Sequence, residues 1–149
     1  MNISNNTFQK YEVNVTENSR IYPVYKEGIV VAYKLFQLNP RLFRIKSLEG
    51  PSVLPINSEF FGQQLFKTGG KDLILTCSET ECLKVYESLN GEIPVVSSFF
   101  GIVGFQKQVI GNKEFLDSFQ NIYLLYLQED QKEMKELFPE FKHIVLNSL

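Results

Sequence analysis

The sequence predicts an α/β protein with a mainly parallel four-stranded sheet and flanking helices, preceded by a small antiparallel β subdomain. From Tyr11 to about Gly62, β-branched and aromatic residues are interrupted by turn-forming residues, which is typical of strands. After Gly69, short apolar runs alternate with segments of helical spacing, which favours an open parallel sheet. The chain has 149 residues, enough for one compact domain or two small subdomains that share a core.

The N-terminal part begins with a polar segment, residues 1–10, which we expect to be a disordered lead-in; it has no apolar core like that of a secretory signal. The clearest strand covers residues 28–36 and follows the turn residues Lys26-Glu27-Gly28. Asn39-Pro40 marks a turn, and residues 42–45 alternate apolar and basic side chains as a second strand does. These features predict a β-hairpin or a small antiparallel sheet.

A loop punctuated by Gly50-Pro51 and Pro55 is expected to lead into Phe60-Phe61-Gly62. The later strands of the parallel sheet are predicted from four apolar runs, at residues 72–76, 93–97, 122–127 and 143–146.

Helices are predicted between these strands, near residues 79–89, 112–119 and 129–138. Ser78 is a candidate N-cap, with Glu79 and Glu81 in the first turn, where the helix dipole favours acidic side chains. Right-handed crossovers place the strand-to-helix loops along one edge of the sheet, where such sheets bind ligands.

Composition excludes some classes of protein. No apolar run approaches the roughly 18 residues that span a bilayer, so no membrane partner is expected. The formal charge of −2 argues against binding nucleic acid by net charge alone, although a local basic patch remains open. The spacing of Cys77 and Cys82 fits neither a disulfide framework nor a zinc quartet, which favours a reducing intracellular compartment. The apolar end of the chain suggests a piece of a longer protein.

The segment from Leu73 to Leu83 reads LILTCSETECL. It resembles the first TOPRIM motif of phage-type and Twinkle-type primase-helicases, in which a strand ends in Thr-Glu-Gly-Glu-x-Asp-x-Leu. Further similar stretches occur in the family's order and spacing: 22–25, 28–34, 61–66, 69–71, 94–97 and 119–122. The resemblance covers about residues 20–147 and implies an RNA-polymerase-like β subdomain at 11–66 and a TOPRIM-like domain at 67–149.

The departures from the motif fall on the family's catalytic positions. The glutamate that acts as the base on the priming hydroxyl is replaced by Cys77, whereas Glu79 is retained and the aspartate becomes Glu81. The Asp-x-Asp pair after the third strand corresponds to Leu127 and Glu129, with Asp130 following. Two-metal phosphoryl transfer needs converging carboxylates, and neither a leucine side chain nor a thiol is a suitable magnesium ligand.

Two interpretations of the acidic residues remain open. Either these side chains bind magnesium in a shifted geometry, or they are only favourable charges at the beginnings of helices. The candidate ligands are Glu79, Glu81, Glu129 and Asp130.

Four basic residues in the β subdomain are candidates for single-stranded DNA binding: Lys34, Arg41, Arg44 and Lys46. We expect them to lie near one groove that faces the edge of the parallel sheet, unless they are simply solvated. Phe36 interrupts the basic series that the family shows here. Tyr33, Phe36 and Phe43 are able to add base stacking where their rings are exposed.

The resemblance implies a catalytically eroded primase-like module of a replicative DNA helicase, Twinkle-like, with a structural or single-stranded-DNA-guiding role. Its partners are then weakly bound DNA and the helicase domain of the same parent chain. The Twinkle-like relation alone suggests a mitochondrial location. The alternatives are an active magnesium-dependent primase domain and a stand-alone protein that mimics a primase.

Overall fold

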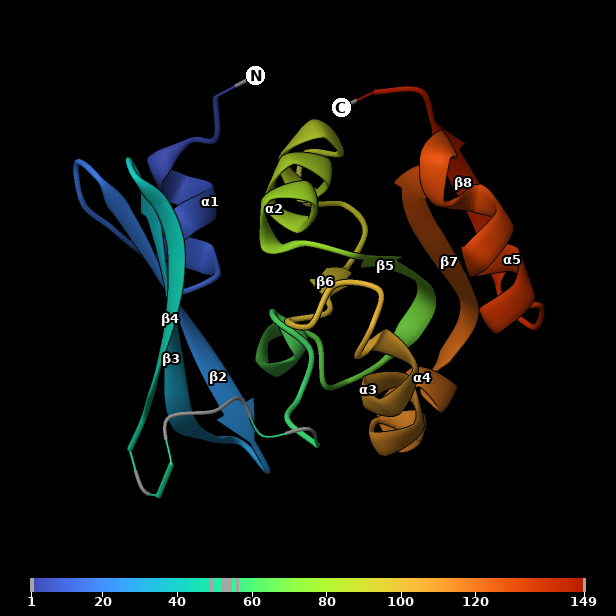
Figure 1. Cartoon of the computed structure of the whole chain (residues 1–149). Helices are drawn as coiled ribbons and strands as arrows, with labels where there is room; N and C mark the ends of the chain where they lie inside the picture. Colours follow the sequence, from blue (N-terminus) through green and yellow to red (C-terminus); the bar gives the residue numbers. More distant parts are fainter. Residues whose placement is uncertain (1, 49, 52–54, 56, 149) are drawn as a thin grey trace.

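The computed structural model describes residues 2–48, 50–51, 55 and 57–148, and it contains two four-stranded sheets (Figure 1). The first, sheet A, is antiparallel and the second, sheet B, is parallel, which confirms the predicted fold class. In Figure 1 helices α1 (Asn5–Lys10) and α2 (Glu79–Ser88) lie between the two sheets, and α5 (Gln131–Leu137) lies on the side of sheet B away from sheet A. No described helix is long and apolar enough to cross a membrane.

Sheet A has the order β1-β2-β3-β4, and each strand pairs with its neighbour in sequence. Its strands are β1 (Asn14–Val15), β2 (Ser19–Lys26), β3 (Ile29–Leu38) and β4 (Arg41–Ser47). Glu27 and Gly28 connect β2 to β3, and both have positive φ, +53° and +80°. Two successive left-handed residues make the tight hairpin turn whose twist matches that of the strands.

Sheet B has the order β6-β5-β7-β8, so the chain places its second and third strands on opposite sides of the first. The strands are β5 (Gly70–Thr76), β6 (Val95–Ser97), β7 (Phe119–Leu127) and β8 (Lys142–Leu146). The sequence predicted all four, and they share one sheet. The third and fourth strands begin earlier than expected, at residues 119 and 142 against 122 and 143, whereas β6 begins two residues later.

The helices that connect these strands are short. They are α2 (Glu79–Ser88), α3 (Phe105–Gly111), α4 (Lys113–Asp117) and α5 (Gln131–Leu137), with 3-10 turns η1 (Gln63–Leu65) and η2 (Gln128–Asp130). The predicted N-cap of α2 is confirmed, because the Ser78 hydroxyl accepts a hydrogen bond from the Glu81 amide at 3.2 Å. Asn90 and Gly91, both with positive φ, follow the end of that helix as predicted.

Two of the expectations are corrected. Residues 5–10 form helix α1 (Asn5–Lys10) instead of a disordered lead-in, because Phe8 packs into the core and Ser4 caps the helix. The helix expected over 112–119 is shorter, α4 at 113–117, because Phe119 already belongs to β7; a further helix, α3 at 105–111, precedes it and was not predicted. The predicted loop after Gly50 falls partly on residues 52–54 and 56, outside the described part of the chain.

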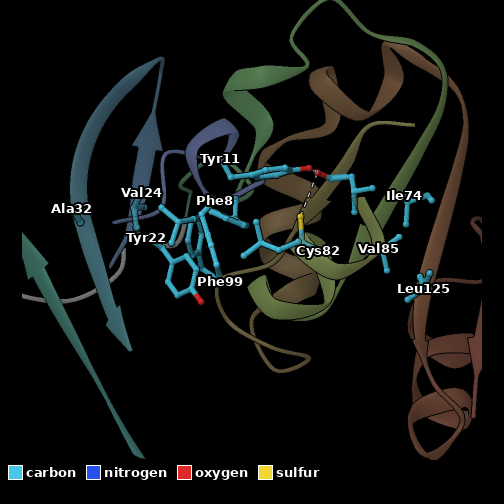
Figure 2. Close-up of a cluster of buried hydrophobic side chains, with 14 residues drawn as sticks. Phe8, Tyr11, Tyr22, Val24, Ala32, Ile74, Cys82, Val85, Phe99 and Leu125 are labelled. Atoms are coloured by element: carbon cyan, nitrogen blue, oxygen red, sulfur yellow. Dashed lines mark hydrogen bonds between the residues drawn. The ribbon is translucent and has the colours of Figure 1, made fainter. Parts of the chain in front are cut away.

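The main core lies between the two sheets and is centred on Tyr11 (Figure 2). This side chain is fully buried, and its hydroxyl donates a 2.7 Å hydrogen bond to the Val95 carbonyl on β6. Its ring contacts the rings of Phe61 and Tyr86, with centroids 5.3 and 5.1 Å away. Residues of sheet A, such as Tyr22, belong to the same cluster, so one core joins both sheets.

A second core covers the opposite face of sheet B. Alternate residues of β5 separate the two cores, with Ile74 facing sheet A and Leu73 and Leu75 facing α3 and α5. The helices contribute Phe105 and Met134, both fully buried. Sheet B is therefore covered on both faces, as its continuously apolar strands require.

Gly62 is a position at which the core permits no side chain, and it supplies a test of this packing. Its φ is +89°, and a Cβ there would lie 2.5 Å from Cε2 of Tyr11. We expect Gly62→Ala to lower the free energy of unfolding by about 3 kcal/mol, because left-handed strain and overpacking add.

The matched control is Gly101→Ala. Gly101 also has positive φ, +63°, but a Cβ there meets nothing within 4 Å. Only the backbone cost of about 1–2 kcal/mol applies. Denaturant unfolding of both variants checks the difference, and equal losses would contradict the packing of Tyr11 against Gly62.

Candidate functional site

The loops that follow β5 and β7 meet at the carboxyl edge of sheet B. These strands are neighbours, with Leu75 opposite Leu124, so residues 77–79 and 128–130 leave the sheet side by side. The structure thereby brings Cys77, Glu81 and Asp130 close enough for their charges to interact. This is the edge at which open parallel sheets bind ligands.

Glu79 is paired with Lys34 of sheet A. The Lys34 Nζ lies 2.5 Å from Glu79 Oε1 and also donates to the Phe99 carbonyl at 3.1 Å. The exposed fractions of the two side chains are only 12% and 9%. Burial raises the pKa of the Glu79 carboxyl, and the Lys34 ammonium opposes that rise. A predicted metal ligand and a predicted DNA contact are therefore each other's partners.

Glu81 is half-buried and interacts with both Cys77 and Asp130. Burial raises the pKa of its carboxyl, and the negative charge of Asp130 adds to the effect, whereas the hydrogen bond with Ser78 opposes it. Its Oε2 is buried and has no hydrogen-bond partner among the described residues.

The Cys77 thiol has a raised pKa. Burial is the largest cause, the negative charges of Glu81 and Asp130 add to it, and together they raise the pKa to about 12. The thiol is therefore protonated at neutral pH and is not a nucleophile.

The four candidate magnesium ligands do not form one site. Among the described residues, no group of three or more His, Cys, Asp or Glu side chains is arranged to hold a metal ion. Glu79 is committed to Lys34, Glu129 is exposed, and Leu127 offers no oxygen where the family has an aspartate. Magnesium requires several oxygen ligands in near-octahedral geometry, so this arrangement of side chains does not fit it.

The four basic candidates lie on two faces of sheet A, and the expectation of a single groove is wrong. In the pairing of β3 with β4, Lys34 lies opposite Ile45 and Leu38 opposite Arg41, whereas Leu35 lies opposite Arg44. Side chains alternate between the two faces of a strand, so neighbouring positions point in opposite directions. Lys34 and Arg41 face sheet B, while Arg44 and Lys46 face away from it.

Lys34 and Arg41 belong to a cluster with two aromatic rings, Phe36 and Phe43, which we call the inner cluster. The ring centroids are 5.0 Å apart; the Arg41 guanidinium lies 5.5 Å from the centre of Phe36 and the Lys34 ammonium 5.0 Å from that of Phe43. Phe43 is 56% exposed. In the sequence Phe36 interrupts a basic series, but in the sheet it belongs to this cluster. Residues two apart on a strand share a face, so the spacing of Lys34 and Phe36 on a predicted strand already indicated that they lie together.

The fold is similar to that of solved primase structures from bacteriophage T7. The primase fragment of the bacteriophage T7 primase-helicase matches with a TM-score of 0.78 and 24% identity, over 96% of this chain and 61% of that chain. A structure of the bacteriophage T7 lagging-strand DNA polymerase interacting with primase domains of two gp4 subunits, bound to an RNA/DNA hybrid and dTTP, matches with a TM-score of 0.79 and 24% identity. That match covers 99% of this chain and 77% of the other.

These likenesses show that the chain has the fold of the primase fragment, as the first TOPRIM motif and its flanking stretches predicted. The chain spans about 61% of the length of the first of these structures. No protein-family model matches the chain, and no curated protein sequence does.

The Lys34–Glu79 pair predicts a pH-dependent loss of stability in Lys34→Met. Removing the cation leaves a buried carboxylate without an opposite charge, which we expect to lower the free energy of unfolding by about 3–5 kcal/mol at pH 7. Because burial raises the pKa of Glu79 in the folded state, the folded protein binds this proton more tightly than the unfolded one. The loss should be largest above the folded-state pKa and shrink as pH falls toward about 4.3, the ordinary glutamate value.

Denaturant titrations at pH 4.5 and pH 7 measure this effect. The double variant Lys34→Met/Glu79→Leu should recover most of the loss, since it removes both charges. Lys113→Met is the control: it breaks an exposed pair with Asp117 and should cost about 0.5 kcal/mol or less. A Lys34→Met loss as small as the control's would mean that the pair is not buried in solution.

Proposed function

We propose that this chain is a primase-like module of a replicative DNA helicase that guides single-stranded DNA and does not synthesise primers. The inner cluster carries the proposal, because it presents an exposed phenylalanine and a guanidinium beside the carboxyl edge of sheet B. The likeness in fold to the T7 primase fragment supports the replicative setting, with a helicase domain of the parent chain as partner.

The chemistry of the inner cluster suits a single strand of nucleic acid. A base stacks on an exposed aromatic ring whatever its identity, and a neighbouring guanidinium contacts the phosphate. Arg41 is exposed and can make this contact while its guanidinium lies over the Phe36 ring, whereas Lys34 is held by Glu79 and Phe99. Since one module supplies few cations and the net charge is −2, we expect a dissociation constant on the order of tens of micromolar or weaker.

The proposed loss of primer synthesis rests on the carboxyl edge. The family's base is replaced by a protonated Cys77, and an aspartate position is taken by Leu127. An active magnesium-dependent primase would need Glu79 to leave Lys34 and converge with Glu81 and Asp130. The T7 likenesses lend no support to a Twinkle-like relation or a mitochondrial location, so the proposal includes neither.

DNA binding should depend on the inner cluster. Arg41 is the inner-cluster cation that contacts a phosphate, so Arg41→Ala/Phe43→Ala should reduce the slope of log affinity against log salt by about 0.7 and weaken binding about tenfold or more. Fluorescence anisotropy with a labelled oligothymidylate at low and moderate salt measures both quantities.

The control is Lys107→Ala/Lys135→Ala, which removes two exposed cations from α3 and α5 on the far side of sheet B. It should leave the affinity within about twofold. Absence of binding at low salt, or equal effects of the two double variants, would contradict the guiding role.

Metal binding and primer synthesis should be absent in the natural sequence and partly restorable. We expect Cys77→Glu/Leu127→Asp to tighten Mn²⁺ binding at least about tenfold, because two carboxylates then join Glu81 and Asp130 at the carboxyl edge. Isothermal titration with Mn²⁺ measures the change. Template-dependent dinucleotide synthesis by the unsubstituted protein, abolished by Glu79→Ala, would contradict the proposal and favour the active primase.

A further inference from the structure

The face of sheet A that points away from sheet B carries its own set of exposed groups. Tyr33 on β3 and Lys46 on β4 are directly opposite each other, and Leu35 is opposite Arg44, so these four side chains share this outer face. With Ile21 of β2 they line a hollow of about 570 Å³. In Figure 1 no described helix or strand lies on this side of sheet A.

The two cations of the outer face are unpaired. Arg44 and Lys46 are exposed, and within the described ranges neither forms an ion pair, a hydrogen bond or a cation–π contact. They stand two residues apart on one strand, so their Cα atoms are about 6.6 Å apart along it. Lys34 and Arg41, by contrast, have partners in the inner cluster. The outer cations are therefore available to an anionic partner.

The rest of the outer face is apolar and aromatic. Tyr33 is 38% exposed, and Leu35 and Ile21 are half-buried beside it. One acid, Glu12, lies at the rim, and its carboxylate already accepts hydrogen bonds from the Tyr25 hydroxyl and the Gln64 side-chain amide. Counting Glu12, Arg44 and Lys46, the hollow carries a net positive charge.

We propose that the outer face of sheet A is a second binding surface for single-stranded nucleic acid. Arg44 and Lys46 contact successive phosphates, and Tyr33 stacks on a base. An exposed ring flanked by cations on a sheet is the arrangement that binds single strands without sequence preference. The inference goes beyond the proposed function, which places DNA on the opposite face, and it does not depend on the inner cluster.

Photo-crosslinking with an oligothymidylate that carries 5-iodouracil distinguishes the two faces. Trypsin cuts after Lys26, Lys34, Arg41 and Arg44, so Tyr33, Phe36 and Phe43 fall in three different peptides. We expect crosslinks in the peptide 27–34, lost in Tyr33→Ala. Crosslinks confined to the peptides 35–41 and 42–44 would overturn this inference and leave the proposed function standing. Crosslinks confined to the peptide 27–34 would support this inference and contradict DNA binding by the inner cluster.

Binding measurements provide the second arm. Arg44→Ala/Lys46→Ala should reduce the slope of log affinity against log salt by about 1.4, since each lost single-strand phosphate contact removes about 0.7. Tyr33→Ala should weaken binding about fivefold or more, and Tyr33→Phe should retain it.

The Lys107→Ala/Lys135→Ala control should change neither the salt slope nor the affinity, and thermal unfolding confirms that each variant is folded. An unchanged slope, or binding of a poly-glutamate peptide but not of the oligonucleotide, would overturn the proposal, the latter in favour of an acidic protein partner.

Discussion

The ion pair between Lys34 and Glu79 fixes the relation between the two sheets. It joins the middle of β3 to the first turn of α2, and both side chains are almost fully removed from solvent. Two charges lose their hydration there, and this cost is offset by the short contact, the Phe99 carbonyl and the positive end of the α2 dipole. The pair joins the inner face of sheet A to the helix that begins at the carboxyl edge of sheet B. The aromatic core around Tyr11 fills the space beside it.

The same contact changes the chemistry of the edge. A carboxylate neutralised by a buried ammonium is a poor candidate for coordinating magnesium, and its neighbours do not replace it, since Cys77 is a protonated thiol and Leu127 is a hydrocarbon. Glu81 and Asp130 remain close together, but Glu81 shares its surroundings with a like charge instead of a cation. The edge has a capped helix and two adjacent loops, but its described residues offer no set of converging oxygen ligands.

Sheet A carries a different kind of group. Its exposed cations and rings are distributed over both faces of a twisted sheet, with Phe36, Arg41 and Phe43 on one side and Tyr33, Arg44 and Lys46 on the other. Stacking and charge, the interactions that such groups can make, need no fixed metal geometry. The lack of converging carboxylates among the described residues of the edge and the cations and rings of sheet A are therefore physically independent features.

The fold class, the four parallel strands and the Ser78 cap were predictable because each depends on local pattern: apolar runs, helical spacing and a capping side chain three residues before its partner. That Cys77 and Leu127 stand where the motif they resemble has acidic residues is likewise visible in the chain itself. Helix α1 was missed, since so short a polar segment depends on contacts with residues distant in sequence: Phe8 packs into the core, and Ser4 and Thr7 donate hydrogen bonds to Glu87. Register separated the basic residues into two faces, and tertiary contact paired Lys34 with Glu79, 45 positions away. Local sequence specifies which residues form each element, whereas long-range packing decides which of their charges meet, because that depends on where whole elements come to lie.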